Sequence, residues 1–254
     1  MEVDLFLFMG QSNMAGRGIV TGEHAEGAPK LTEGAGYEYR AVSSPGKLYP
    51  IEEPFGCLEN REGGIDDGDM KTGSLVTAFA NTYYEKTGIP IVGISASKGG
   101  SRIDQWQPKG DFLEDTIERL HAAEAYLAEK HYDVRHRFIL WCQGESDGDT
   151  GKSGELYRKE FERMLDAMLK EGIEKCFLIR IGNYNGTEAV DYKEIMEAQD
   201  IIAQTNPDVV VVSKSFAKMK ERGLMKDEFH YFQEAYNFVG REAGENVGQY
   251  VLEI

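Results

Sequence analysis

The sequence predicts an α/β fold in which helices cover both faces of a central parallel sheet. Several short apolar runs along the 254-residue chain are nearly continuous in hydrophobicity, as expected of parallel strands buried on both faces. Segments with apolar residues at helical spacing separate these runs, and such alternation is typical of βαβ units. Because no repeat and no proline-, glycine- or serine-rich linker divides the chain, we expect one domain over residues 1–254.

Five apolar runs are the expected strands. In order they are Val3–Met9, Ile89–Ala96, Arg137–Cys142, Cys176–Ile181 and Val209–Val212. Helices are indicated where apolar residues recur three to four positions apart, over Leu75–Tyr83, Leu113–Leu127, Tyr157–Met168, Tyr192–Ile202 and Phe232–Val239. The first helical segment has a candidate cap at Thr72 or Ser74 and ends before Gly88.

The segment 18–71, called the insertion below, departs from this alternation of strands and helices. It is rich in glycine, glutamate and proline and has no clear periodicity, so we expect a long loop. Loops of this length inside a domain are usually functional or mobile, although a surface insertion without a role stays an open alternative. The acidic run Asp66–Asp69 lacks the EF-hand pattern, which favours a solvated loop over a cation site.

Composition argues against several functions. The chain has 28 Lys and Arg against 44 Asp and Glu, and the net charge of −16 opposes binding to nucleic acid or to an anionic membrane. The three cysteines have no CxxC spacing, so a disulfide framework and a structural zinc site both lose support. No apolar stretch approaches the roughly 18 residues of a membrane span, and we find no signal peptide. We expect a cytoplasmic protein.

Polar, glycine-flanked segments follow the expected strands. In open α/β sheets, ligands bind beyond the carboxyl ends of the strands, so these segments should meet at one edge. They are Gly10–Gly16, Ser97–Ser101, Gln143–Asp147, Gly182–Asn185 and Asp227–His230.

Ser12 is the candidate nucleophile. It lies where the chain leaves the first strand, and Gly10 and Gly16 permit a tight turn there. The segment is not the G-x-S-x-G elbow of α/β-hydrolases, because Met14 occupies the second glycine position. A serine that caps a helix is the alternative.

His230 is the candidate base. It follows the last strand, and Asp227 three positions earlier is placed to orient its ring, which gives a Ser-Asp-His triad. Capping of the final helix by Asp227 is the alternative. The other histidines lie in the insertion, beside a helical stripe or near the start of a strand: His24, His121, His131 and His136.

Two further groups suit the stabilisation of an oxyanion. Gly100 offers an unhindered backbone N–H, and Gln143 offers a side-chain N–H, although both also suit plain turns. Glu145 and Asp147 alternatively suggest the carboxylate pair of a glycosidase.

Four motifs in one order resemble the SGNH-hydrolase superfamily. They are GQSNMAG at 10–16, GGSRIDQW at 99–106, WCQGESD at 141–147 and D-x-x-H at 227–230. More narrowly, they resemble its sialate O-acetylesterase/acetylxylan esterase branch, which is carbohydrate esterase family 6-like. The resemblance implies a flavodoxin-like α/β/α sandwich with a five-stranded parallel sheet, and deacetylation without metal or cofactor.

The resemblance also implies roles for individual residues. It makes Ser12 the nucleophile, His230 the base and Asp227 its orienting acid. It makes the amides of Ser12 and Gly100 oxyanion donors together with Gln143, which stands where many SGNH enzymes have Asn. Asn13 and Glu145 match motif positions that support the site, and Ser101 stands where Thr is common in this branch.

These observations predict a serine esterase that removes O-acetyl groups from small carbohydrates. Trp106 and the insertion are candidates for the sugar platform, with core packing the alternative for Trp106. The negative charge favours neutral acetylated oligosaccharides over sialic acid, although Arg17 or Arg102 could offset it locally. A sialate O-acetylesterase, a non-catalytic sugar-binding protein of the same fold, and a lipase or thioesterase of the superfamily are the alternatives.

Overall fold

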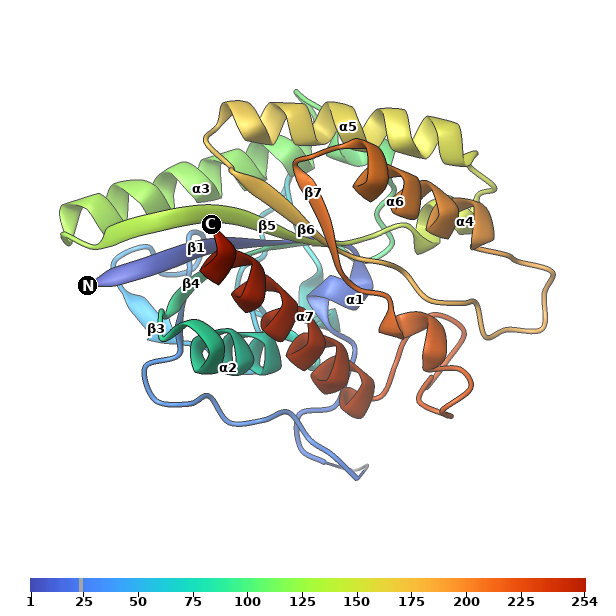
Figure 1. Ribbon diagram of the computed structural model, residues 1–254, viewed down its shortest axis with the longest axis horizontal. Coiled ribbons are helices and arrows are strands. Elements are labelled where there is room, and N and C mark those ends of the chain that lie inside the picture. Colours follow the sequence, from blue (N-terminus) through green and yellow to red (C-terminus); the bar gives the residue numbers. More distant parts are fainter. Residues whose placement is uncertain (23–24) are drawn as a thin grey trace.

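The computed structural model describes residues 1–22 and 25–254, so His24 lies outside the described residues. It confirms the α/β fold: the central sheet is parallel except at one edge, and helices flank both of its faces (Figure 1). Each expected strand is present, as β1 (Glu2–Gly10), β4 (Ile91–Ser97), β5 (Asp133–Cys142), β6 (Lys175–Ile179) and β7 (Val209–Ser213).

The insertion contributes two strands, where the sequence predicted only a loop. β2 (Gly36–Tyr39) pairs in parallel with β4, and β3 (Leu48–Pro50) pairs antiparallel with β2. The sheet therefore has seven strands in the order β3-β2-β4-β1-β5-β6-β7, and the expected number of five is corrected. Strands of three and four residues are too short to show a periodic pattern, and pairing with the edge of β4 stabilises them.

The five predicted strands have the flavodoxin-like order. Numbered by chain position among themselves, β4-β1-β5-β6-β7 is 2-1-3-4-5, and the order reverses beside β1. Because these strands are parallel, their carboxyl ends lie along one edge of the sheet. The switch point brings the segments that follow β1, β4 and β5 next to one another.

The helices form two outer layers. On one face lie α3 (Asp111–Glu129), α5 (Gly154–Lys170) and α6 (Lys193–Thr205), and on the other α2 (Val76–Thr87) and α7 (Gln233–Glu253) (Figure 1). Short helices occupy the segments that follow strands, namely α1 (Ser12–Ala15), α4 (Glu145–Asp149) and the 3₁₀ turns η2 (Ile103–Trp106) and η3 (Ser215–Lys218), while η1 (Gly68–Met70) lies in the insertion.

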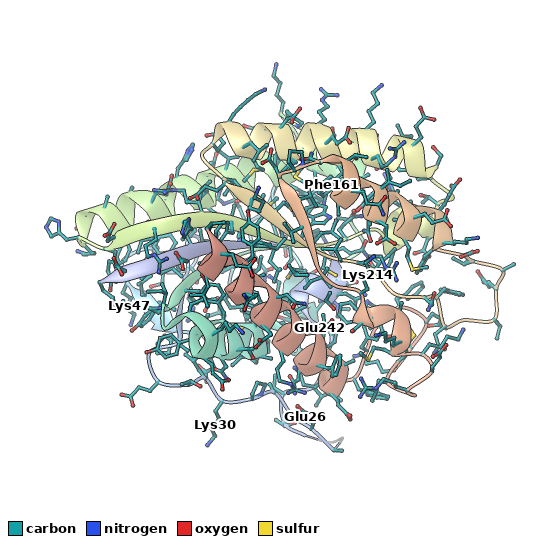
Figure 2. All side chains as sticks on the ribbon, viewed as in Figure 1. Glu26, Lys30, Lys47, Phe161, Lys214 and Glu242 are labelled. Carbon is teal, nitrogen blue, oxygen red and sulfur yellow. The ribbon has the colours of Figure 1, made fainter. Side chains whose placement is uncertain are left out.

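Successive residues of β1 enter different cores because strand side chains alternate between faces. Phe6 and Phe8 pack with α2 and α7, whereas Leu5, Leu7 and Met9 pack with the helices of the other face. Both sets are buried, which explains the continuous apolar run in the sequence. Figure 2 compares a buried side chain with an exposed one. Phe161 lies on the inner side of α5, while Lys30 projects away from the fold.

A buried arginine joins the insertion to the sheet and to α3. The Arg119 guanidinium is fully buried and donates to both carboxylate oxygens of Asp115, at 3.0 and 2.9 Å. It also donates to the carbonyl of Ser95 at the end of β4 (2.8 Å). Its remaining bonds reach two carbonyls of the insertion, those of Glu59 (3.0 Å) and Ile65 (3.3 Å). All five N–H donors of this side chain are thus used.

The insertion also stabilises the start of α2. The N-cap of this helix is Leu75, so the predicted cap at Thr72 or Ser74 was wrong, although the Oγ of Ser74 accepts the Val76 N–H at 3.0 Å. The Glu53 carboxylate accepts the N–H groups of Ser74 (2.8 Å) and Thr77 (3.2 Å). A negative charge at this position satisfies free N–H groups and interacts favourably with the helix dipole.

Residues 1–22 and 25–254 contain no helix that is both long and apolar enough to cross a membrane.

We predict that replacing Arg119 by methionine lowers the free energy of unfolding by about 3–5 kcal/mol. The five buried hydrogen bonds of Arg119 are lost, and Asp115 stays buried with only the partly exposed Arg61, 2.9 Å away, as a cation. Arg119→Lys should be nearly as harmful, since an ammonium group lacks the planar set of five donors. Urea unfolding followed by circular dichroism measures both effects. Arg163→Met, on the exposed face of α5, is the matched control and should change stability by less than about 0.5 kcal/mol. An Arg119→Met protein as stable as this control would contradict the prediction.

Candidate active site

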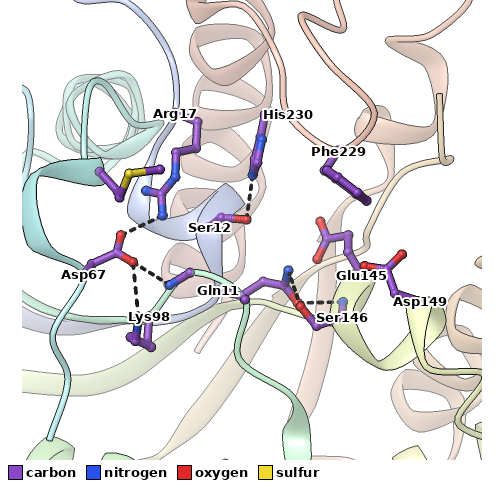
Figure 3. A pocket seen from close by; sticks show the side chains of 13 residues that line it. Gln11, Ser12, Arg17, Asp67, Lys98, Glu145, Ser146, Asp149, Phe229 and His230 are labelled. Atoms are coloured by element: carbon purple, nitrogen blue, oxygen red, sulfur yellow. Dashed lines mark hydrogen bonds and ion pairs between the residues drawn. The ribbon is translucent and has the colours of Figure 1, made fainter. Parts of the chain in front are cut away.

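A pocket of about 340 Å³ opens at the carboxyl ends of β1, β4 and β5 (Figure 3). Ligand pockets span roughly 300–1,000 Å³, so this one is small. Its lining comes from the segments that follow these three strands, from the insertion and from the segment 227–230. The lining residues are Gln11, Ser12, Arg17, Asp67, Met70, Lys98, Gly99, Gly100, Glu145, Ser146, Asp149, Phe229 and His230.

The turn that presents Ser12 depends on a glycine at the end of β1. Gly10 has φ of +139°, and a Cβ there would lie 2.0 Å from the carbonyl oxygen of Cys142 on β5. Gly10 therefore allows β1 and β5 to approach closely where the chain turns into α1. The residue at the N-cap of α1 is Gln11, and the Oγ of Ser12 bonds to His230 instead of capping the helix.

Ser12, His230 and Asp227 form a hydrogen-bonded series. The Oγ of Ser12 lies 2.9 Å from Nε2 of His230, and Nδ1 of His230 lies 2.9 Å from Oδ2 of Asp227 (Figure 3 shows the first contact). The other carboxylate oxygen of Asp227 accepts the N–H groups of Phe229 (2.8 Å) and His230 (2.7 Å). Asp227 does not cap α7, which begins at Gln233.

The surroundings of His230 and Asp227 favour a neutral imidazole and an ionised carboxylate. Burial lowers the pKa of His230 below its usual 6.5, against the opposing effect of Asp227, so the ring is neutral and able to accept a proton at neutral pH. Partial burial acts to raise the pKa of Asp227, but the two N–H donors and the His230 ring outweigh it, and that pKa is lowered. An ionised Asp227 then holds the Nδ1–H tautomer of His230.

Two backbone N–H groups in the pocket are free to bind a ligand. Among the described residues, neither the N–H of Ser12 nor that of Gly100 donates to a protein acceptor. Ser12 is in the first turn of α1, where N–H groups have no partner inside the helix. Gly100 is exposed at the tip of the segment after β4.

The structure does not bring Gln143 into the pocket. Its amide nitrogen donates to the carbonyl of Ser101 (2.9 Å) and to Asp147 (2.5 Å), and its side chain is fully buried. These two bonds use both N–H groups, which leaves none for an oxyanion. Gln143 was expected to donate to an oxyanion. In the structure it instead links the segment after β4 to the segment after β5.

Asn13 and Glu145 lie where supporting residues are expected. Asn13 Nδ2 donates to Oε1 of Glu145 (2.6 Å) and to the carbonyl of Phe229 (3.1 Å), while its Oδ1 accepts the hydroxyl of Tyr236 (2.7 Å). This network joins α1 to the segment that carries His230. Among the described residues, the second oxygen of Glu145 has no hydrogen-bond partner and is buried beside the pocket. Burial raises the pKa of Glu145 to about 7.

The two sugar-platform candidates have different outcomes. Trp106 is fully buried, donates to Ser101 Oγ at 3.0 Å and packs edge-to-face on Trp141, so it is a core residue. The insertion does reach the pocket, through Asp67 and the largely exposed Met70. The aromatic ring that lines the pocket is Phe229, which the sequence did not single out for this role.

The acidic segments also separate into distinct environments. Asp147 is buried and accepts from Ile103 N–H (3.0 Å) as well as from Gln143, so it does not form a glycosidase pair with Glu145 in the pocket. Asp66 and Asp69 are exposed as predicted, whereas Asp67 is buried, contrary to a solvated loop. The described residues contain no group of three or more His, Cys, Asp or Glu placed to hold a metal ion.

Of the two arginines considered from the sequence, Arg17 lines the pocket. It donates to Asp67 at 2.8 Å and is 6% exposed. Arg102 lies outside the pocket lining and pairs with Asp104 at 3.0 Å.

Comparison with known proteins identifies the family. Residues 2–249 match the family model described as carbohydrate esterase, sialic acid-specific acetylesterase. The chain belongs to this family. Membership confirms the resemblance found in the four motifs and supports carbohydrate esterase activity for the protein.

One relative has a carbohydrate esterase name, and two solved structures share the fold of this chain. A probable carbohydrate esterase of Arabidopsis thaliana is 25% identical over 199 residues, which cover 77% of this chain and 74% of the relative. The crystal structure of an Arabidopsis thaliana protein superposes with a TM-score of 0.71 at 21% identity, covering 98% of each chain. A carbohydrate acetylesterase from Xanthomonas citri has the same fold, with a TM-score of 0.56 at 17% identity over 98% of this chain and 56% of the other.

The environment of Glu145 generates a prediction about stability. Its pKa is raised from 4.5 to about 7 in the native protein, so the native state holds a proton that the unfolded chain has lost between these pH values. Stability contributed by this group is therefore lost as the pH rises from about 4.5 to 7. We expect Glu145→Gln to match the wild type near pH 4 and to exceed it by about 3 kcal/mol at pH 8.

Urea unfolding at several pH values measures this difference. Glu85→Gln, at an exposed site on α2, is the control and should follow the wild-type curve throughout. Parallel curves for Glu145→Gln and the wild type would show that Glu145 does not titrate as described.

Proposed function

We propose that this protein is a serine O-acetylesterase that removes acetyl groups from carbohydrates through an acetyl-enzyme. The observation that carries the proposal is the hydrogen-bonded series from Ser12 through His230 to Asp227, with 2.9 Å at each side-chain contact. Membership of the carbohydrate esterase family supports an ester of a sugar as the substrate.

In the first half of the reaction, Nε2 of His230 takes the proton of Ser12 as Oγ attacks the acetyl carbonyl carbon. The N–H groups of Ser12 and Gly100 stabilise the negative charge on the carbonyl oxygen. The bond from the acetyl carbon to the sugar oxygen then breaks, and His230 gives its proton to that oxygen. Gln143 serves as a support for the two neighbouring segments, because both of its N–H groups are engaged.

In the second half, His230 takes a proton from water, and the oxygen of that water attacks the acetyl-enzyme. The second tetrahedral intermediate collapses to acetate, and the proton returns from His230 to Ser12. Asp227 keeps its charge throughout and stabilises the imidazolium that forms in each half.

We propose neutral acetylated oligosaccharides as the substrates. Glu145 and Asp149 line the pocket, and the unpartnered Oε2 of Glu145 is a hydrogen-bond acceptor for a sugar hydroxyl. Asp149 and the net charge of −16 disfavour an acidic sugar. The small pocket, with its walls from the insertion and from 227–230, favours short chains over an intact polymer.

O-acetyl sialic acid is the second candidate, and Arg17 is the observation that favours it. A guanidinium in the pocket is a suitable partner for a carboxylate. Asp67 pairs with this guanidinium at 2.8 Å and lies 4.0 Å from Nζ of Lys98, so one carboxylate partly offsets two cations of the pocket lining. Because Asp149 and the net charge of the chain also oppose an anion, neutral sugars remain the preferred substrate.

We predict that Ser12→Ala lowers turnover of an acetylated sugar by more than about 10³-fold while sugar binding is retained. A serine-reactive organophosphonate should label Ser12 in the wild type. Acetate release and mass spectrometry of the labelled protein measure the two effects. The control is Ser146→Ala, a second pocket serine that should keep activity within a few-fold. Full activity in Ser12→Ala would reject the nucleophile, and absence of labelling and turnover in the wild type would favour a sugar-binding protein.

A second prediction concerns substrate choice. We expect a higher kcat/KM for acetylated xylo- or manno-oligosaccharides than for the intact polymers or for O-acetyl sialic acid. Because salt screens the repulsion between like charges, added salt should improve the sialate more than the neutral sugars. Acetate release at low and moderate salt checks this, and a preference for the sialate at low salt would overturn the assignment to neutral sugars.

A further inference from the structure

A buried carboxylate of the insertion bonds directly to the segment that carries Gly100. Asp67 is 4% exposed, and its Oδ1 accepts the backbone N–H of Gly99 at 2.8 Å. Its Oδ2 accepts from Nη2 of Arg17 at 2.8 Å (Figure 3). The carboxylate thus joins the insertion, the segment after β4 and the segment after α1 at one side of the pocket.

The fit between this ion pair and Gly99 is close. A Cβ at Gly99 would lie 2.3 Å from Nη2 of Arg17 and 2.8 Å from Oδ1 of Asp67. Both distances are shorter than real Cβ contacts allow, so the ion pair packs against the backbone of Gly99 itself. The glycine at this position is explained by the approach of Arg17 and Asp67.

The segment 98–101 needs such a contact because its middle consists of two glycines. Its ends are held where Lys98 N–H donates to the Gly10 carbonyl (2.9 Å) and Ser101 N–H donates to the Lys98 carbonyl (3.3 Å). Between them, the bond from Gly99 to Asp67 is the hydrogen bond that fixes the backbone within the described part of the chain. Consecutive glycines have wide conformational freedom, so the direction of the Gly100 N–H depends on this bond.

Asp67 itself is firmly placed. Its N–H donates to Asn60 Oδ1 at 2.9 Å, and two residues earlier the N–H of Ile65 donates to Asp115 at 2.8 Å. Arg119 binds the carbonyl of Ile65, so the segment around Asp67 is tied to the same buried cluster that joins the insertion to the sheet. Rigid support of this kind is what a preorganised oxyanion site requires.

We propose that Asp67, held by Arg17, is a positioning residue that aims the Gly100 N–H at the substrate's oxyanion through its bond to Gly99. The inference rests on the proposed function and assigns the insertion a part in catalysis. An ion pair with a purely structural role is the competing explanation, and it predicts a loss of stability without a change in the turnover of folded protein.

The experiment compares wild type, Asp67→Asn and the matched control Asp69→Asn, which changes an exposed carboxylate two residues away. The readouts are kcat and KM for p-nitrophenyl acetate, and the affinity for phenylboronic acid, which forms a tetrahedral adduct on a nucleophilic serine. We expect kcat of Asp67→Asn to fall about 10–100-fold with KM within about two-fold, since complete loss of an oxyanion donor costs about 10²–10³-fold. Boronate affinity should fall in parallel, and Asp69→Asn should behave as wild type.

Gly99→Ala provides an independent variant if Asp67→Asn does not fold. The added methyl displaces the ion pair while Asp67 and Arg17 remain present, and we expect the same fall in kcat and in boronate affinity. Circular dichroism of each variant verifies that the protein measured is folded. A folded Asp67→Asn or Gly99→Ala with wild-type kcat and boronate affinity would overturn the positioning role.

The wild-type arm separates this proposal from the proposed function. Turnover and Ser12-dependent boronate binding in the wild type, combined with unaffected variants, reject the positioning role alone. A wild type that shows neither rejects the esterase mechanism, and the positioning role with it.

Discussion

The fully buried guanidinium of Arg119 is the interaction on which the active-site architecture depends. It binds one carboxylate on α3, one carbonyl at the end of β4 and two carbonyls of the insertion. A cation without solvent contact is favourable only when all its donors are satisfied, so the insertion must adopt the path that supplies those carbonyls. That path ends at Asp67, beside the pocket. The Arg119 cluster therefore helps to set the path of the insertion and the shape of the site.

The sheet explains why residues far apart in sequence meet in the pocket. Reversal of strand order beside β1 places the ends of β4, β1 and β5 next to one another, and the segment 227–230 closes the fourth side through the Asn13 network. The proposed nucleophile, the free N–H groups and the proposed base thus come from separate segments. Each segment is held by hydrogen bonds to its neighbours, so the position of one segment depends on the positions of the others.

The sequence predicted the parts of the molecule that have a local pattern. Strands buried on both faces are continuously apolar, and helices with one buried face show a stripe, so most of their ends were predicted to within about four residues. The exception is α7, which continues to Glu253 although the predicted stripe ends at Val239. Ser12 and His230 could be proposed as nucleophile and base because they follow strands and belong to motifs that cover nearly the whole chain. The strands of the insertion were missed because segments of three or four residues carry no periodicity, and their pairing with β4 is a long-range contact.

The orientation of side chains accounts for the other differences. The same motif that drew attention to Gln143 could not show that the carboxylate of Asp147, four residues later, accepts a hydrogen bond from its amide. Trp106 was a candidate platform by residue type alone, but the short turn η2 carries it into the core. Asp67 appeared to belong to a solvated acidic run, and its burial depends on Arg17, 50 residues away in sequence.

The pairing of Arg17 with Asp67 also bears on how the pocket treats charge. A lone buried guanidinium at this position would attract anionic sugars and would draw the developing oxyanion toward itself. Asp67 pairs with Arg17 at 2.8 Å and lies 4.0 Å from Nζ of Lys98, so a single carboxylate partly offsets the charge of two cations in the pocket lining. On the opposite side, Glu145 and Asp149 present acceptors. The pocket lining thus combines hydrogen-bond donors and acceptors, as the proposed neutral sugar requires, and the N–H groups of Ser12 and Gly100 are the proposed donors to the charge that forms during the reaction.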